Sequence, residues 1–328
     1  MMRRFAVQCV SSLFLFFISL QSQSQSQSQS QSQSQSQSLP IVTGMQSKLD
    51  LFLKSSDTLS ASRRNTVVIT QASLASFTLI GLDQLWYADF ERSKFKTTND
   101  ADDWLQMDKF GHVFSAYQLT RVGANTLNWA GVSKTDQLIY GATLGFGFLT
   151  AVELFDGYSQ KWGFSWSDMT ANAAGTGLYI GQELLWDEQR IALKYSFHQT
   201  QFAKQRPDKL GNGFLEEVLK DYNGQTYWLS ANVKSFFKSS EIPRWINVAF
   251  GYGAEGMISG RAGEINNLMI PQNRRRQFYL SLDVDLSKIQ TQSRLLRTVF
   301  DVLNVIKVPA PTISFDRKGG VKLYYIYF

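Results

Sequence analysis

The hydrophobic positions of this chain follow two different periods, and the change falls near residue 187. Before it, apolar residues recur at helical spacing in four long stretches, residues 66–86, 108–129, 133–155 and 165–186. Gly131 is a stop signal after the second stretch, and Ser133 and Ser165 are suited to cap the third and fourth. The pattern predicts a bundle of about four helices over residues 63–187.

After residue 187, apolar residues alternate with polar or small ones, which is the period of β-strands. The alternating stretches are residues 190–198, 227–234, 246–253, 278–285, 312–316 and 321–328. Two short helices are expected among them, at residues 214–222 and 293–306. Each longer stretch has one apolar face, which is typical of an antiparallel sheet. The expected fold class is therefore α+β, with an antiparallel β-rich region over residues 188–328.

The apolar face of such a sheet has two possible neighbours. It can pack on the helices in a two-layer domain, or it can face lipid in a small outer-membrane β-barrel with a polar lumen. The aromatic-rich final stretch, which ends at Phe328, is similar to the last strand of outer-membrane barrels. Only about six strands are expected, whereas bacterial single-chain barrels begin at about eight. We therefore favour packing of the sheet on the helices.

The N-terminus has the pattern of an export signal. Arg3 and Arg4 precede an apolar run, residues 5–20, that is too short to be a comfortable membrane span. We interpret residues 1–20 as a signal peptide. A Gln-Ser dipeptide then repeats nine times, which predicts a disordered leash and linker over residues 21–62.

The use of cysteine agrees with export. Cys9 is the only cysteine of the chain and lies inside the apolar run, so the mature protein is expected to have no thiol, disulfide or lipid anchor. The expected location is the periplasm or the outer membrane. The formal net charge of +6 comes from dispersed residues without a nucleic-acid-binding motif. The expected partners are membrane lipid or envelope components and no nucleic acid, and the sequence does not indicate an oligomeric state.

Three groups of polar residues interrupt the apolar helical stretches. The first is Asp108-Lys109-Phe110-Gly111-His112, the second contains Glu153 and Asp156, and the third contains Ser165, Asp168 and Asn172. In each group, polar residues three or four positions apart lie on one helix face. Burying them costs free energy unless they meet partners. We therefore expect the three helices to meet at these groups.

The polar groups allow three interpretations. The candidate catalytic residues are His112, Asp108, Glu153 and Asp168, with Lys109, Asp156 and Asn172 as a supporting polar cluster. Asp108 could orient His112 from one turn away, and burial would raise the pKa of Glu153, which together suits acid–base chemistry. The four candidates would also suit Mg, Mn or Zn. A purely structural core, with a helix cap and a turn, fits as well. The sequence implies no particular cofactor and leaves open whether the protein is an enzyme.

These motifs carry a resemblance. Asp108-Lys109-x-x-His112, Glu153-x-x-Asp156 and Ser165-Trp166-x-Asp168 with Gly175 resemble the YfiM-like family of periplasmic lipoproteins, a domain of unknown function, mainly over residues 104–185. The wider chain looks like a long form found in envelope proteins of the Bacteroidota type. The first and third motifs are more loosely similar to VanZ-like membrane proteins. The resemblance implies an envelope location and this set of residues, and it brings no established reaction.

Overall fold

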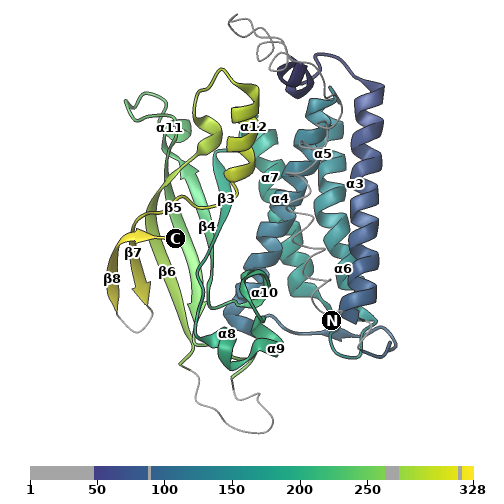
Figure 1. Cartoon of the computed structure of the whole chain (residues 1–328), viewed down its shortest axis with the longest axis vertical. Coiled ribbons are helices and arrows are strands. Elements are labelled where there is room, and N and C mark those ends of the chain that lie inside the picture. Colours follow the sequence, from purple (N-terminus) through teal and green to yellow (C-terminus); the bar gives the residue numbers. More distant parts are fainter. Residues whose placement is uncertain (1–47, 88–89, 263–272, 317–319) are drawn as a thin grey trace, which may run out of the picture.

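The computed structural model describes residues 48–87, 90–262, 273–316 and 320–328. Helices α3 to α7 lie side by side, and the sheet of strands β3 to β8 lies next to them (Figure 1). The α+β fold class is therefore confirmed. The expected signal peptide and the Gln-Ser tract lie outside the described residues, and the division of the chain into domains stays a prediction.

The helical stretches correspond to five α-helices. They are α3 (Ala61–Leu82), α4 (Met107–Trp129), α5 (Lys134–Ala142), α6 (Phe148–Gly157) and α7 (Trp166–Trp186). The third stretch forms α5 and α6, which a π-helical segment, Thr143–Gly147, joins without a break. Ser133 and Ser165 cap α5 and α7, because their hydroxyl oxygens accept hydrogen bonds from the backbone N–H of Asp136 and Asp168.

Glycines allow these helices to pack closely. A Cβ atom at Gly175 of α7 would lie 2.1 Å from the carbonyl oxygen of Val113 on α4. A Cβ atom at Gly145 would lie 2.1 Å from Oγ1 of Thr120, also on α4. Both distances are far shorter than a van der Waals contact. The missing side chains therefore let α7 and the α5–α6 run approach α4 on two sides.

All six strands of the large sheet are antiparallel neighbours in chain order. They are β3 (Ile191–Phe197), β4 (Gln225–Asn232), β5 (Ile246–Glu255), β6 (Arg275–Val284), β7 (Ala310–Asp316) and β8 (Val321–Tyr327). In the described part of the chain, β3 and β8 are the two edges and do not pair with each other. The sheet is therefore open, and the alternative of a closed barrel is wrong.

Short elements complete the fold. The two expected short helices are present as α10 (Phe214–Lys220) and α12 (Arg294–Leu303). Three four-residue helices were not expected, namely α8 (Phe202–Gln205), α9 (Pro207–Leu210) and α11 (Val233–Phe236). A two-stranded parallel pair, β1 (Thr97–Thr98) with β2 (Phe164–Ser165), joins the loop before α4 to the start of α7.

The two faces of the sheet are buried differently from the expectation. Part of the apolar face does pack on α4, where the ring of Phe110 stacks on Tyr252 with centroids 4.4 Å apart. The rest is open to solvent, with Leu229, Val248, Phe250, Leu280 and Leu282 between 41% and 55% exposed. We call these five residues the outer apolar patch.

The opposite, polar face is the buried one. Asp283 is fully buried and pairs with two fully buried lysines, with 2.9 Å to Nζ of Lys194 and 3.7 Å to Nζ of Lys307. Tyr327 on β8 lies against Trp228 on β4, although three strands separate β4 from β8, with ring centroids 6.1 Å apart. A flat sheet would hold these rings much farther apart, since neighbouring strands are about 4.8 Å apart. The sheet therefore curls around its polar face.

Two helical segments are long and apolar enough to cross a membrane, Ala61–Leu82 and Lys134–Gly157. In the most apolar 18-residue part of each segment, 6% of Ala61–Leu82 and 28% of Lys134–Gly157 is buried inside the protein. Core helices and signal sequences can share this length and composition. Residues 61–82 are nevertheless a second exposed apolar surface of the protein, besides the outer apolar patch of the sheet.

Candidate functional site

The candidate site lies where the first turns of α4 and α7 meet the last turn of α6. Lys109, Glu153, Asp168 and Asn172 are buried there. The side chains of Asp108 and His112 keep 24% and 18% of their surface exposed. The structure thus brings the three polar groups of the sequence together, and it leaves the cluster accessible from the side of Asp108 and His112.

Lys109 is the centre of the charged part of this cluster. Its Nζ atom lies 2.6 Å from Oδ1 of Asp168, 2.9 Å from Oδ1 of Asp100 and 3.0 Å from Oδ2 of Asp108. The ammonium group donates a hydrogen bond to Asp108 and forms ion pairs with Asp168 and Asp100. One ammonium group therefore holds carboxylates from α4, α7 and the preceding loop in fixed positions.

His112 is held by an amide rather than by a carboxylate. Its Nδ1 atom lies 3.0 Å from Oδ1 of Asn172, so Nδ1 carries a proton and donates it. Its Nε2 atom lies 4.0 Å from Oδ1 of Asp108, 3.8 Å from Oε1 of Glu153 and 3.8 Å from Oδ1 of Asp168. We had expected Asp108 to orient the ring, but 4.0 Å is too long for a direct hydrogen bond.

The cap of α7 contributes to the site. The hydroxyl of Ser165 accepts from the backbone N–H of Asp168 at 3.1 Å. In a capping box, the carboxylate of Asp168 would accept in turn from the N–H of Ser165. Here Oε2 of Glu153 accepts that hydrogen bond instead, at 3.2 Å. The carboxylate of Asp168 is therefore available to Lys109.

Several contributing residues were not predicted from the sequence. Oδ1 of Asp100 accepts hydrogen bonds from the hydroxyls of Ser165 at 2.6 Å and Ser167 at 2.8 Å. The phenol of Tyr222 donates to Oδ1 of Asp108 at 2.8 Å. Asp100 lies in a charged loop, and Tyr222 is 114 residues from its partner. No local sequence pattern connects such residues, so only the fold could reveal them.

Asp156 belongs to the border of the cluster. Its Oδ1 atom accepts a hydrogen bond of 2.7 Å from the phenol of Tyr87. It lies at the end of α6, where we expected a turn, and α6 ends at the next residue. Asp156 therefore links α6 to the segment after α3 and contributes negative charge to the site from a distance.

The backbone immediately before α4 is strained. Trp104, Leu105 and Gln106 have φ values of 51°, 52° and 67°. This left-handed backbone conformation is unfavourable for residues other than glycine. The phenol of Tyr252 donates to the carbonyl oxygen of Leu105, and the N–H of Trp104 donates to that of Gly260 at 2.8 Å. Such strain concentrates at functional sites, where surrounding contacts maintain it. Here the strained backbone determines where α4 begins and therefore where Asp108 lies.

Burial and charge set the protonation of the acids. Burial raises the pKa of Glu153 to about 8, helped by the charge of Asp168 and opposed by His112. Burial likewise raises the pKa of Asp168 to about 6, against the attraction of His112 and Lys109. The pKa of Asp100 is instead lowered, to about 2, because hydrogen bonds from Ser165, Lys109 and Ser167 outweigh the effect of burial.

The basic groups are shifted upward. Burial alone would lower the pKa of His112, but the surrounding Asp108, Asp168 and Glu153 raise it above its usual value. The pKa of Lys109 is raised in the same way by Asp108 and Asp168, so this side chain stays charged. Near neutral pH the protonated forms of both Glu153 and His112 are therefore favoured.

A metal ion is the other chemistry that the cluster allows. Oxygen atoms of Asp108 and Asp168 and a ring nitrogen of His112 all lie within 4.8 Å of one another. Two carboxylates and one imidazole suit Mg²⁺, Mn²⁺ or Zn²⁺. Asp168, however, already has the ammonium group of Lys109 at 2.6 Å. This positive charge would compete with a metal cation for the carboxylate of Asp168.

Comparison with known proteins gives a family match over part of the chain. Residues 96–181 match the model of a family described as "Predicted periplasmic lipoprotein (DUF2279)". No curated protein and no solved structure shows a significant match. The matched region includes the site residues from Asp100 to Asn172 and supports an exported periplasmic protein of unknown activity. The YfiM-like and VanZ-like names, and the expected lack of a lipid anchor, stay predictions.

Proposed function

We propose that this exported protein acts on a lipid or glycan component of the cell envelope, with the His112 cluster as an acid–base centre. The observation that carries the proposal is the position of Nε2 of His112, 3.8–4.0 Å from three carboxylate oxygens. This separation is about 1 Å longer than a direct hydrogen bond, so Nε2 makes no direct hydrogen bond to these three carboxylates and can instead contact a water or substrate atom that lies beside them.

Each residue has a role in this proposal. His112 exchanges a proton through Nε2, and Asn172 fixes the tautomer by accepting from Nδ1. Glu153, whose pKa is raised to about 8 by burial, is protonated at neutral pH and serves as the acid. Lys109 keeps Asp108 and Asp168 in place, and the partial exposure of Asp108 and His112 gives access to a substrate.

Replacement of His112 by alanine tests the proposal. We expect His112→Ala to abolish complementation of the envelope phenotype of a deletion strain while the melting temperature changes little, because this side chain is only partly buried. His198→Ala is the matched control, since the other histidine of the chain lies beside Tyr327 in the sheet region, outside the cluster. Full complementation by His112→Ala, or equal losses of function and stability, would contradict an acid–base role.

Glu153→Gln gives an independent measurement. The carboxyl group has a pKa of 4.5 when unperturbed and about 8 in the fold. Between these pH values the folded state holds a proton that the unfolded state releases. The contribution of Glu153 therefore makes the unfolding free energy fall as pH rises from about 4.5 to about 8. Urea unfolding from pH 5 to pH 8 should therefore show a flatter pH dependence for Glu153→Gln. An unchanged slope would mean that Glu153 is not held protonated.

We further propose that the partner of this protein is a membrane lipid surface. The outer apolar patch supports this, because an exposed, contiguous apolar face usually marks a binding surface. The described segment Ala61–Leu82, with 6% of its apolar window buried, adds to the same argument. Lipid contact would cover apolar surface that the fold itself leaves in water, and it would bring the His112 cluster close to envelope lipids.

Charges placed in the patch test this partner. Phe250→Glu with Leu282→Glu should reduce co-flotation with phosphatidylethanolamine–phosphatidylglycerol vesicles by about tenfold or more, because each buried apolar side chain contributes about 1.5–3 kcal/mol. Gln201→Glu with Gln205→Glu is the control, since it adds the same two charges at exposed polar positions. Equal flotation of the two double variants would exclude the patch as the lipid contact.

A further inference from the structure

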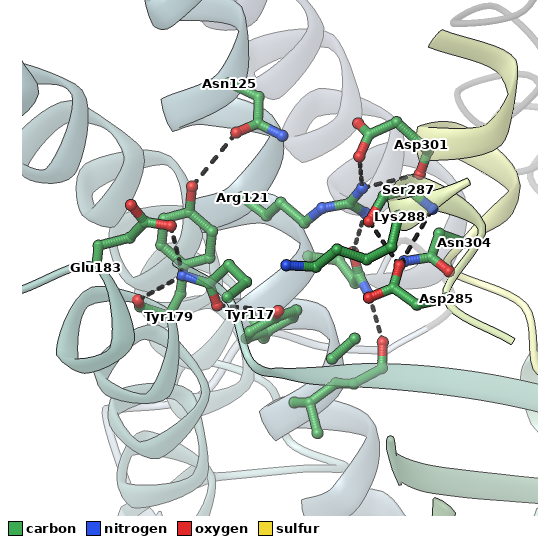
Figure 2. A pocket seen from close by; sticks show the side chains of 14 residues that line it. Tyr117, Arg121, Asn125, Tyr179, Glu183, Asp285, Ser287, Lys288, Asp301 and Asn304 are labelled. Atoms are coloured by element: carbon green, nitrogen blue, oxygen red, sulfur yellow. Dashed lines mark hydrogen bonds and ion pairs between the residues drawn. The ribbon is translucent and has the colours of Figure 1, made fainter. Parts of the chain in front are cut away.

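A cavity lies away from the His112 cluster, between the helices and the sheet region. Its volume is about 270 Å³, and its walls come from α4, α7, the start of β3, residues 285–288 and α12. Figure 2 shows side chains from these elements converging on one space. We propose that this cavity binds a neutral, hydroxyl-rich ligand of the size of one sugar residue.

The walls of the cavity are fixed by hydrogen bonds between its own lining residues. Arg121 on α4 donates to the carbonyl oxygen of Asp301 on α12 at 2.8 Å and pairs with its carboxylate. Gln189 accepts from the phenol of Tyr117 at 3.1 Å and donates to Glu183 at 2.8 Å. These contacts join segments that are far apart in the sequence, so the cavity is a preformed feature of the fold.

Asp285 supplies the observation that points to a ligand. This residue is 4% exposed, and its Oδ1 atom accepts from the N–H of Ser287 at 3.1 Å, from the hydroxyl of Ser287 at 2.5 Å and from Nδ2 of Asn304 at 2.9 Å. Figure 2 shows the second oxygen turned away from these donors. Among the described residues, no lysine or arginine nitrogen pairs with Asp285. The three donors to Oδ1 offset part of the cost of burying a carboxylate without a cationic partner, and a ligand that donates a hydrogen bond to the second oxygen would offset more of it.

The charges of the cavity decide which ligand class fits. Glu183, Asp285 and Asp301 line it, so an anionic ligand would be repelled. The cations at its edge are already paired, Arg121 with Asp301 and Lys288 with Glu188. A phosphate or carboxylate ligand would have to break these pairs. The lining therefore favours a ligand that donates hydrogen bonds and carries no negative charge.

A sugar matches the remaining features. Its hydroxyls can donate to Asp285 and Glu183, and its ring oxygen or a hydroxyl oxygen can accept from the amide of Asn125. The rings of Tyr117 and Tyr179 and the side chain of Leu193 supply an apolar wall for its C–H groups. Within the described part of the chain, the phenol of Tyr179 makes one hydrogen bond, a long one of 3.4 Å to Oδ1 of Asn125, which a ligand hydroxyl could replace.

Ligand titration tests the proposal. Purified protein is titrated at millimolar concentrations with N-acetylglucosamine, glucose and galactose, and with inorganic phosphate and ethanolamine as probes of other classes, followed by ligand-observed NMR. We expect at least one sugar to bind and the two other probes not to bind. Binding of ethanolamine or phosphate without any sugar, or no binding of any sugar, would overturn the assignment.

Two variants locate the binding. Asp285→Asn keeps the shape of the side chain and should weaken sugar binding about tenfold or more, because a hydrogen bond to a charged group is lost. Tyr179→Phe removes only one hydroxyl and gives a second measurement if Asp285→Asn folds poorly. Asp57→Asn, at a position whose side chain is 84% exposed, is the control. Sugar affinity that is unchanged in both cavity variants would place the binding elsewhere.

Discussion

Replacing Asp283 by alanine is expected to lower the unfolding free energy by about 3–5 kcal/mol, the cost of leaving a buried charge without its partner. Asp283 neutralises Lys194 and Lys307 inside the curled sheet, and all three side chains are fully buried. Burial already lowers the pKa of Lys307 to about 8, with Asp283 acting in the opposite direction. Without Asp283, two ammonium groups would share a site with no counter-charge.

Urea denaturation with Asp57→Ala as the control measures this effect. The side chain of Asp57 is 84% exposed and pairs with Lys54, so its loss should cost no more than about 1 kcal/mol. A third variant, Asp283→Asn, keeps a polar group that can accept from the hydroxyl of Ser230. If Asp283→Ala were as mild as the surface control, the polar face would be hydrated rather than buried.

The second large effect is expected at the contact between α4 and α7. Gly175→Ala would place a Cβ atom 2.1 Å from the carbonyl oxygen of Val113, so the two helices must separate. We expect a loss of stability of about 1–3 kcal/mol or more, as for other overpacked cores. The separation would also lengthen the contacts of Lys109 with Asp168 and of His112 with Asn172, so function should fall with stability.

Gly177→Ala is a matched control on the same helix. A Cβ atom there would meet nothing within 4 Å, and alanine favours helix by about 0.5–1 kcal/mol over glycine. Thermal unfolding should therefore show opposite shifts for the two variants, and the NMR signal of the His112 ring should move only in Gly175→Ala. Similar melting temperatures for both variants would argue against close contact between α4 and α7.

Much of the fold follows from local pattern. The helices around Asp108, Glu153 and Asp168 could be predicted because apolar residues recur at helical spacing and Ser133 and Ser165 supply caps. The strands could be predicted because apolar residues alternate with polar or small ones. The predicted end of the second strand was less accurate. The alternating stretch runs to residue 234, whereas β4 ends at Asn232 and the helix α11 begins at Val233.

The candidate site was predictable in its members and less so in its contacts. Spacing on the helices was enough to select Lys109, His112 and Glu153 as groups that should meet. It was not enough to show that Asn172, rather than Asp108, holds His112, because both are plausible partners from the sequence. Asp100 and Tyr222 enter from a loop and from a segment far along the chain.

The sequence by itself determined the type and order of the elements and the polar residues that interrupt them, because the direction of each side chain follows from local backbone geometry. Only the tertiary structure decided which face of the sheet is buried. The alternation would allow either face, and the pairing of Asp283 with Lys194 and Lys307 makes burial of the polar face possible. The tertiary structure likewise decided the surroundings of His112, since long-range packing brings Asn172 of α7 to 3.0 Å and Glu153 of α6 to 3.8 Å from its ring.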